Sequence, residues 1–143
     1  MTRVSFHFNV ADRRDYACRL LRKATRAGSR LVVTGPAPLL SDLDKALWTF
    51  DPLEFLPHWR GDSLQRLPAV LRSTPVLLLE RPEPAEGYDV LLNLGPTVPP
   101  ACEAFDRLIE VVSRQESDRL QARERWRHYA QAGLPIERHE VNA

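Results

Sequence analysis

The chain has 143 residues, of which 43% are hydrophobic and 27% are charged, and its formal net charge is +1. These values are typical of one soluble globular domain, and they exclude a disordered chain, a coiled coil and a membrane protein. The longest purely aliphatic run, residues 76–79, is far shorter than the roughly 20 residues that span a bilayer. The small net charge creates no global field for nucleic acid. Because the first residues show no signal peptide pattern, we expect a cytoplasmic protein.

Strands and helices are predicted to alternate in the first half of the chain. Apolar side chains at every second position from Val4 to Val10 indicate a strand with one buried face. A helix is predicted over residues 13–27, and Gly28 is expected to end it. A short aliphatic strand over 31–33 and a second helix over 41–48 follow. This alternation favours parallel strands joined by helical crossovers.

The second half of the chain continues the pattern with shorter elements. Strands are predicted over residues 76–80, 90–94 and 108–112, and helices over 101–105 and 118–131. Residues 55–58 are expected to form a short strand or an extended loop, because Pro57 restricts the residue before it. Ser117 is expected to cap the last helix and Gly133 to end it, which leaves residues 134–143 as a C-terminal tail. The sequence therefore predicts a single α/β domain over residues 1–133, with a mostly parallel central sheet flanked by helices.

Motifs of common enzymes are absent or incomplete. The glycines form neither GxGxxG nor GxxxxGK, and Asp12 places a carboxylate in the turn after the first strand, so we expect no nucleotide-binding glycine loop. Residues 61–64 (GDSL) resemble the nucleophile block of a hydrolase, but the chain has no Asp-x-x-His to activate the serine. The four histidines form no HxH or HxxxH pair, and Cys18 and Cys102 lie far apart. The sequence predicts no catalytic residue, cofactor or metal.

The most informative feature is a stripe of cations beside an indole on the last predicted helix. At about 100° per residue, Arg119, Arg123 and Arg127 fall within about 80° of one another, and Trp126 lies about 20° to one side. Guanidinium groups next to an indole suit an anionic partner that carries an apolar side chain. Two other interpretations stay open: the stripe is a solvated charged face, or it binds single-stranded nucleic acid with bases stacked on Trp126.

Three segments of the sequence resemble the chi subunit family of bacterial DNA polymerase III. The first is the predicted strand and helix that end near residues 28–32. The second is residues 43–48 (LDKALW) followed by 55–58 (FLPH), and the third is residues 121–129 (QARERWRHY) followed by Ala-Gly. Together these segments span almost the whole chain.

The resemblance implies a Rossmann-like α/β fold without a nucleotide, in a non-catalytic adaptor of the replisome. Members of the family bind the C-terminal tail of single-stranded DNA-binding protein, an acidic tail that ends in an aromatic residue with a free carboxylate. By position, the residues that contact this tail correspond to Arg119, Arg123, Trp126 and Arg127, and Val112 lines the pocket for the terminal ring.

The resemblance also implies a second partner, the psi subunit, which links chi to the clamp loader. The expected contact with psi is Phe55, with Leu56 and Trp48 as its neighbours. The chain is then a monomer or a heterodimer with psi, contacts DNA only indirectly and binds no membrane. A direct single-stranded nucleic-acid-binding domain is the alternative function.

Overall fold

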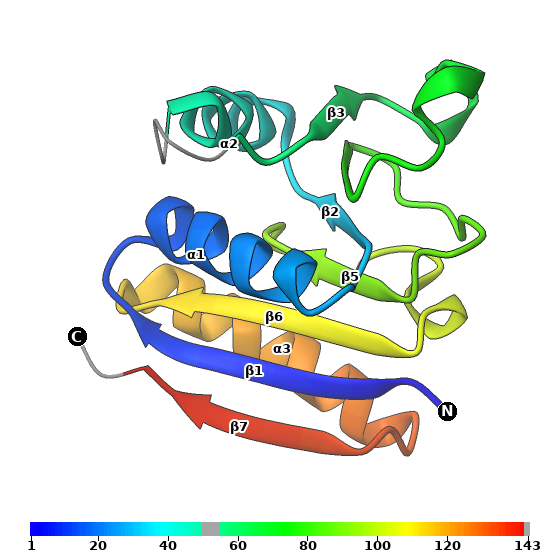
Figure 1. The fold of residues 1–143 in the computed structure, drawn as a ribbon. Coiled ribbons are helices and arrows are strands. Elements are labelled where there is room, and N and C mark those ends of the chain that lie inside the picture. Colours follow the sequence, from blue (N-terminus) through cyan, green and yellow to red (C-terminus); the bar gives the residue numbers. More distant parts are fainter. Residues whose placement is uncertain (50–54, 142–143) are drawn as a thin grey trace.

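A seven-stranded sheet organises the part of the chain that the computed structural model describes, residues 1–49 and 55–141. The strands are β1 (Arg3–Val10), β2 (Leu31–Thr34), β3 (His58–Gly61), β4 (Val76–Leu79), β5 (Val90–Asn93), β6 (Arg107–Ser113) and β7 (Ile136–Glu140). Their order across the sheet is β3-β4-β2-β5-β6-β1-β7, and each neighbouring pair is parallel. Figure 1 shows the long strands β1 and β6 side by side, with β7 at the edge.

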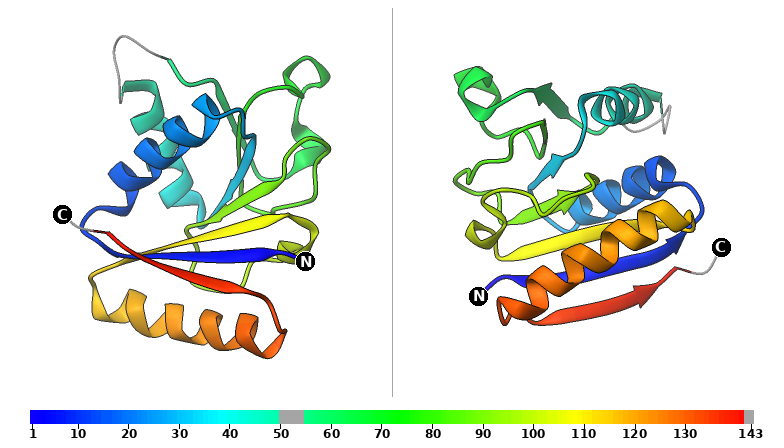
Figure 2. Two further views of the ribbon diagram at one scale, coloured as in Figure 1. Left: turned by 60° about the horizontal axis from the view of Figure 1, so that its bottom comes forward. Right: turned by 180° about the vertical axis from the view of Figure 1, so that it is seen from behind.

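Helices cover both faces of this sheet. α1 (Arg13–Arg26) and α2 (Ala37–Thr49) pack on one face, and α3 (Glu116–Gln131) packs on the other (Figure 2). The expected Rossmann-like α/β fold with a mostly parallel sheet is confirmed. No helix in the two described ranges is both long and apolar enough to cross a membrane.

The alternation of side chains along the strands divides the core into two layers. In β6, Ile109 and Val111 pack toward α1 and α2, whereas Leu108 and Val112 pack toward α3. β2, β4 and β5 are buried along their whole length, which explains why their sequences are almost uninterrupted aliphatic runs. Glu110 lies between Leu108 and Val112 in the α3 layer, where a charge needs a partner.

β1 departs from the simple alternation predicted for residues 4–10. Val4 packs on the α3 side of the sheet, but Val10 packs on the α1 side. Asn9 has a φ of 65°, and the register with β6 shifts between His7 and Val10. This β-bulge turns the end of the strand over, so that the Val10 side chain points to the α1 side of the sheet and not to the α3 side. The prediction of one buried face along the whole strand was therefore wrong at Val10.

His7 on β1 lies half-buried between Tyr16 of α1 and His139 of β7. Its Nδ1 atom and the Tyr16 hydroxyl form a hydrogen bond, and its ring centre lies 4.9 Å from that of His139. Burial lowers the pKa of His7 to about 4, and the neighbouring positive charges of His139 and Arg107 add to the effect. An unfolded histidine titrates near pH 6.5. The contribution of His7 to stability is therefore complete above that pH and is lost as the pH falls toward 4.

Replacing His7 with glutamine is expected to flatten this acid dependence. The midpoint of urea unfolding, measured between about pH 7 and pH 4, should change less with pH in His7→Gln than in the unaltered chain. The control is His128→Gln, at an exposed histidine of α3, which should keep the full pH dependence. An unchanged pH dependence in His7→Gln would contradict a neutral His7 in the folded state.

Residues 134–143, expected to form a tail, contain the last strand of the sheet. β7 pairs in parallel with β1, Leu134 is buried, and Ile136 packs against the α3 layer. Ile136 is the one apolar residue of this strand, because an edge strand exposes most of its side chains. The hydrophobic alternation that marks a strand is thus nearly absent from this segment. The prediction that residues 134–143 form a tail was therefore wrong for residues 136–140. Residues 142–143 lie outside the described ranges.

Other predicted elements shift at their ends. α2 begins at Ala37, four residues earlier than predicted, because Pro38 is tolerated in the first turn of a helix. Of the short strand or extended loop expected at 55–58, residues 55–57 are loop and β3 begins at His58. The helix expected at 101–105 is a single turn of 3-10 helix.

Candidate functional site

The first turn of α3 is anchored by a carboxylate that reaches back to the preceding strand. Asp118 accepts a hydrogen bond from the backbone N–H of Ser113 at 2.7 Å, and the guanidinium of Arg13 lies 3.7 Å from the same carboxylate. The helix begins at Glu116, so the expected capping by Ser117 was wrong. The carboxylate contact orients α3 relative to the end of β6.

A buried ion pair holds the middle of α3 against the sheet. Arg125 donates from Nε to Glu110 of β6 at 3.0 Å, and the two side chains are 2% and 0% exposed. The Tyr129 hydroxyl donates to the other carboxylate oxygen at 2.5 Å, and Nδ2 of Asn93 lies 3.1 Å from both oxygens. The carboxylate is therefore surrounded by donors from α3 and β5.

Burial raises the pKa of Glu110, and the Arg125 cation and the hydrogen bonds oppose this shift without cancelling it. This network was not predicted from the sequence, because Arg125 lies among several other arginines. A signal was available in the helical spacing: Arg125 shares a face with Ala122 and Tyr129, which are both buried.

Beside this network, a cavity of about 400 Å³ opens between α3 and the edge of the sheet formed by β1 and β7. Its volume falls in the usual range of small-ligand pockets, roughly 300–1,000 Å³. The lining residues are Phe6, Phe8, Val112, Arg119, Ala122, Arg123, Trp126 and Arg138. Three arginines and three aromatic rings line the cavity without a carboxylate among the described residues. The α3 cavity therefore suits a ligand that combines negative charge with an apolar side chain.

The α3 cavity brings together four of the five residues predicted for tail binding. Arg119, Arg123 and Trp126 line it from the helix, and Val112 lines it from β6. Trp126 is half-buried, and its ring centre lies 5.0 Å from that of Phe6. The indole is thus a wall of the cavity, fixed on one side by the core.

Arg127 lies outside the α3 cavity, although its spacing placed it on the same stripe. Its guanidinium is exposed and donates to Glu124 at 2.6 Å. On the opposite side of the cavity, the strands supply Phe8 and Arg138, which were not predicted from the sequence. The Arg138 guanidinium carbon lies 5.1 Å from the centre of the Phe8 ring. Arg138 reaches the cavity through the pairing of β7 with β1, so predicting its place required predicting β7.

A second exposed feature, a pair of aromatic side chains, lies at the end of α2. Trp48 and Phe55 are 61% and 52% exposed, and their rings stack with 4.7 Å between centres. His58 packs edge-on against Trp48, and its ring nitrogens hydrogen-bond with Asp44 and with the Leu56 carbonyl. Leu56 is 7% exposed and belongs to the core, so its side chain is not part of the surface formed by the aromatic pair.

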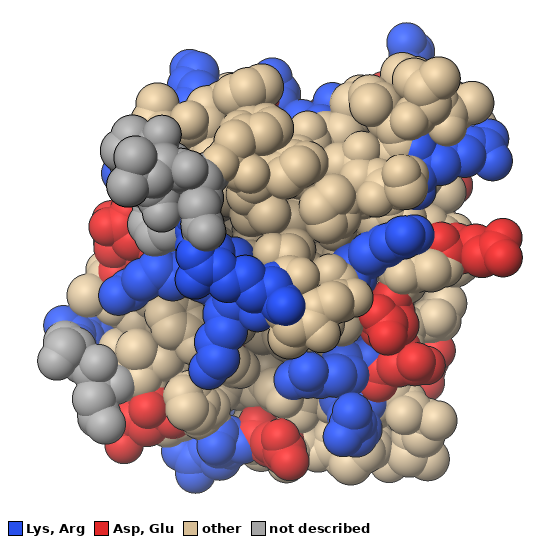
Figure 3. All heavy atoms as spheres, viewed as in Figure 1, with Lys and Arg blue, Asp and Glu red and all other residues tan. Residues whose placement is uncertain are grey.

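Basic side chains also gather on the opposite face of the molecule, over α1 (Figure 3). Six of the fourteen residues of α1 are arginine or lysine. The hollow between α1 and α2 includes the carboxylates of Asp15 and Asp42, and none of its described lining residues is aromatic. This face therefore combines charges of both signs and differs in chemistry from the α3 cavity.

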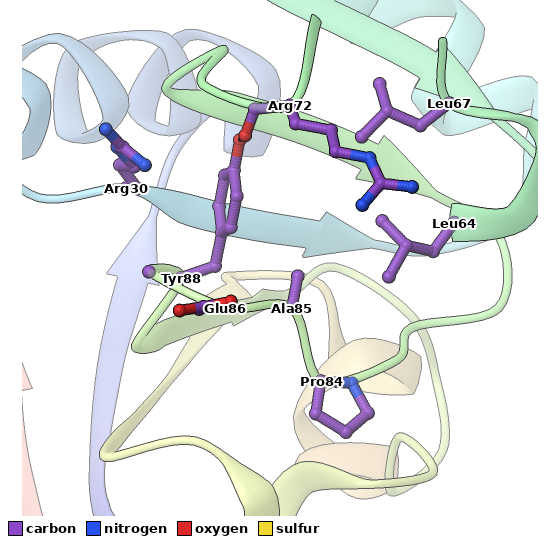
Figure 4. A pocket seen from close by; sticks show the side chains of 9 residues that line it. Arg30, Leu64, Leu67, Arg72, Pro84, Ala85, Glu86 and Tyr88 are labelled. Atoms are coloured by element: carbon purple, nitrogen blue, oxygen red, sulfur yellow. The ribbon is translucent and has the colours of Figure 1, made fainter. Parts of the chain in front are cut away.

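Another cavity, of about 480 Å³, lies near the beginnings of β2 and β5 and is bordered by residues 64–72 and 84–88. Figure 4 shows Arg30 and Arg72 on opposite sides of Tyr88. The Tyr88 hydroxyl lies 2.9 Å from the Arg72 carbonyl oxygen, so its polar atom connects two segments of the chain. Glu86 adds a carboxylate to the lining, which makes this cavity a poorer match to an anion than the α3 cavity.

The fold and the site define an α/β domain with a cationic, aromatic-lined cavity beneath one helix. A family model described as DNA polymerase III chi subunit, HolC, matches residues 1–137. The chain is similar to DNA polymerase III subunit chi of Pseudomonas aeruginosa, with 32% identity over 99% of this chain and 98% of that protein. It is also similar to DNA polymerase III subunit chi of Haemophilus influenzae, with 25% identity over 89% of this chain and 86% of that protein. The chain belongs to the DNA polymerase III chi subunit family, as its sequence motifs predicted.

Proposed function

We propose that this chain is a non-catalytic replisome adaptor in the cytoplasm. It binds the acidic C-terminal tail of single-stranded DNA-binding protein and links that protein to the clamp loader through the psi subunit. Membership of the chi family supports the replisome role. The observation that carries the tail-binding proposal is the α3 cavity, because its lining combines three arginines with three aromatic rings.

The chemistry of the tail matches the α3 cavity in two respects. The terminal aromatic ring of the tail packs between Trp126 and Val112, where apolar surface is available. The free carboxylate of the same residue then lies near Arg119 and Arg123, whose planar guanidinium groups bind carboxylates in a bidentate manner. We expect a dissociation constant in the micromolar range, which corresponds to a binding free energy of about −7 to −8 kcal/mol. The affinity should fall as salt is added, because the contacts are ionic.

Fluorescence anisotropy of the peptide Asp-Asp-Asp-Ile-Pro-Phe, labelled at its N-terminus and titrated with the intact chain, tests this proposal. Saturable micromolar binding is expected, and a peptide without the final Phe should bind at least about tenfold more weakly. A labelled single-stranded oligonucleotide is measured in parallel. If the oligonucleotide binds and the peptide does not, the chain is a direct nucleic-acid-binding domain. No peptide binding by a folded sample at low salt overturns the proposal.

The exposed stack of Trp48 and Phe55 supports a second contact, with the psi subunit. Large aromatic side chains are frequent anchors of protein interfaces, and two of them side by side on a surface favour a docking role. The stack belongs to α2 and the segment before β3, whereas α3 packs on the other face of the sheet. The two partners would therefore use separate surfaces of the chain.

Replacing Trp48 and Phe55 together with alanine is expected to weaken psi binding at least about 30-fold, the loss that corresponds to about 2 kcal/mol, because the truncation of a single interface anchor typically costs that much and the losses of neighbouring anchors do not simply add. Isothermal titration calorimetry with purified psi measures the effect. Binding of the tail peptide should stay the same, because α3 is not altered. Leu120→Ala, at an exposed apolar residue of α3, is the control and should keep its affinity for psi. Unchanged psi binding in the double variant removes this surface from the proposal.

A further inference from the structure

We infer that Arg138 of β7, rather than Arg127 of α3, is the third cation of the tail-binding site and contacts a carboxylate of the bound peptide. This inference rests on the proposed function, because it concerns the same ligand. It adds a specificity-determining residue from a part of the chain that the helical stripe does not include.

The strand register directs Arg138 into the α3 cavity. Its partner on β1 is Phe6, and residues paired across neighbouring strands project to the same face of a sheet. Phe6 packs in the α3 layer, so Arg138 also projects toward α3. Its guanidinium extends over the ring of Phe8, the next β1 side chain on that face, at 5.1 Å from the ring centre.

The contact with Phe8 orients the Arg138 cation and leaves its charge available. A guanidinium over an aromatic face is attracted by the ring but is not neutralised by it. Across residues 1–49 and 55–141, Arg138 forms no ion pair with a carboxylate. Glu140, the register partner of Phe8 two residues further along β7, is not within 4.0 Å of the Arg138 guanidinium, so the two side chains form no ion pair. A ligand carboxylate in the cavity therefore meets an oriented cation that is not already paired with a carboxylate of the described residues.

Arg127 differs from Arg138 in position and in pairing. It does not line the cavity, and its NH1 atom donates to Glu124 at 2.6 Å, so a ligand has to compete with that carboxylate. Arg119 and Arg123 approach the cavity from α3, whereas Arg138 approaches it from the edge of the sheet. A peptide in the cavity therefore lies between cations on two walls, and this arrangement requires Arg138.

Three single variants test the inference with the same labelled peptide. Arg138→Gln is expected to weaken binding about tenfold or more, because it removes one charge-assisted hydrogen bond. Arg127→Gln, which removes the same charge outside the cavity, should weaken binding by less than about threefold. Arg138→Lys keeps the charge and should recover most of the affinity. Because Arg138 is exposed on an edge strand, the melting temperature of each variant should stay close to that of the unaltered chain.

The dependence of peptide affinity on salt concentration is a second measurement. It would not change if Arg138 had only a structural role. The affinity of Arg138→Gln should fall less steeply with added salt than that of the unaltered chain, since one ionic contact is missing. Arg127→Gln should keep the steeper dependence. If the unaltered chain binds the peptide and Arg138→Gln binds equally well, or Arg127→Gln loses more affinity, this inference is wrong and the proposed function stands. If the unaltered chain does not bind the peptide, both are wrong.

Discussion

Replacing Arg125 with methionine is expected to lower the free energy of unfolding by about 3–5 kcal/mol. The substitution leaves Glu110 fully buried without its cation, and an unpaired buried carboxylate costs more than the pair itself contributes. Methionine keeps much of the length of arginine and adapts to irregular space, so the change reports the lost charge rather than a cavity. Urea unfolding followed by circular dichroism at neutral pH measures the effect.

The pH dependence of the Arg125→Met variant identifies the cause. Burial already raises the pKa of Glu110, and removal of the Arg125 cation raises this pKa further. A carboxyl group with a raised folded-state pKa contributes most stability at low pH and loses it as the pH rises through that pKa. The difference in the free energy of unfolding between this variant and the unaltered chain should therefore shrink as the pH falls from neutral toward the ordinary carboxyl pKa of about 4.3, because the loss at His7 is common to both chains.

The matched control is Arg127→Met, two residues further along the same helix. Arg127 pairs with Glu124 at the surface, where an ion pair contributes about 0–1 kcal/mol. This variant should unfold at nearly the same urea concentration as the unaltered chain. Equal destabilisation of the two variants would show that helix propensity, and not the buried pair, causes the loss.

Binding of the tail peptide is expected to fall at least about 30-fold in Arg123→Glu. Arg123 lines the α3 cavity beside Trp126, so a carboxylate at this position faces the negative groups of the ligand. The substitution removes an attraction and introduces a repulsion. The side chain is exposed, and glutamate is a good helix former, so the fold should be retained. Anisotropy with the labelled peptide measures the loss.

Arg14→Glu controls for net charge, because it changes the charge of the chain by the same amount on the other face of the sheet. Arg14 is an exposed residue of α1. At physiological ionic strength the Debye length is about 8 Å, so a distant charge has little effect on the α3 cavity. Arg14→Glu should bind the peptide within about threefold of the unaltered chain. Similar losses in Arg14→Glu and Arg123→Glu would mean that net charge drives the association.

The fold class could be predicted because its strongest signals are local in the sequence. Buried parallel strands appear as short aliphatic runs, and the runs at 76–79 and 90–93 lie in β4 and β5. Gly28 and Gly133 follow α1 and α3 with positive φ angles of 93° and 76°, as expected for residues that end helices.

The features that could not be predicted depend on contacts between segments that are distant in the sequence. Arg125 and Arg123 are indistinguishable by residue type, and the burial of one of them follows from Glu110 on β6. β7 forms because β1 offers an edge, although its own sequence has almost no strand pattern. Arg138 enters the α3 cavity as a consequence. Helical spacing alone therefore identified the α3 wall of the candidate site and missed the wall formed by the sheet.

The most direct test of tail binding at the α3 cavity is an NMR titration of the ¹⁵N-labelled chain with the unlabelled peptide. The chain has three indole N–H groups, which belong to Trp48, Trp59 and Trp126. We expect the Trp126 indole signal to shift with saturation, together with backbone amides of α3, β1 and β7, while the Trp48 and Trp59 signals stay in place. Saturable shifts at Trp48 or along α1, with the Trp126 signal unchanged, would contradict a tail-binding site in the α3 cavity.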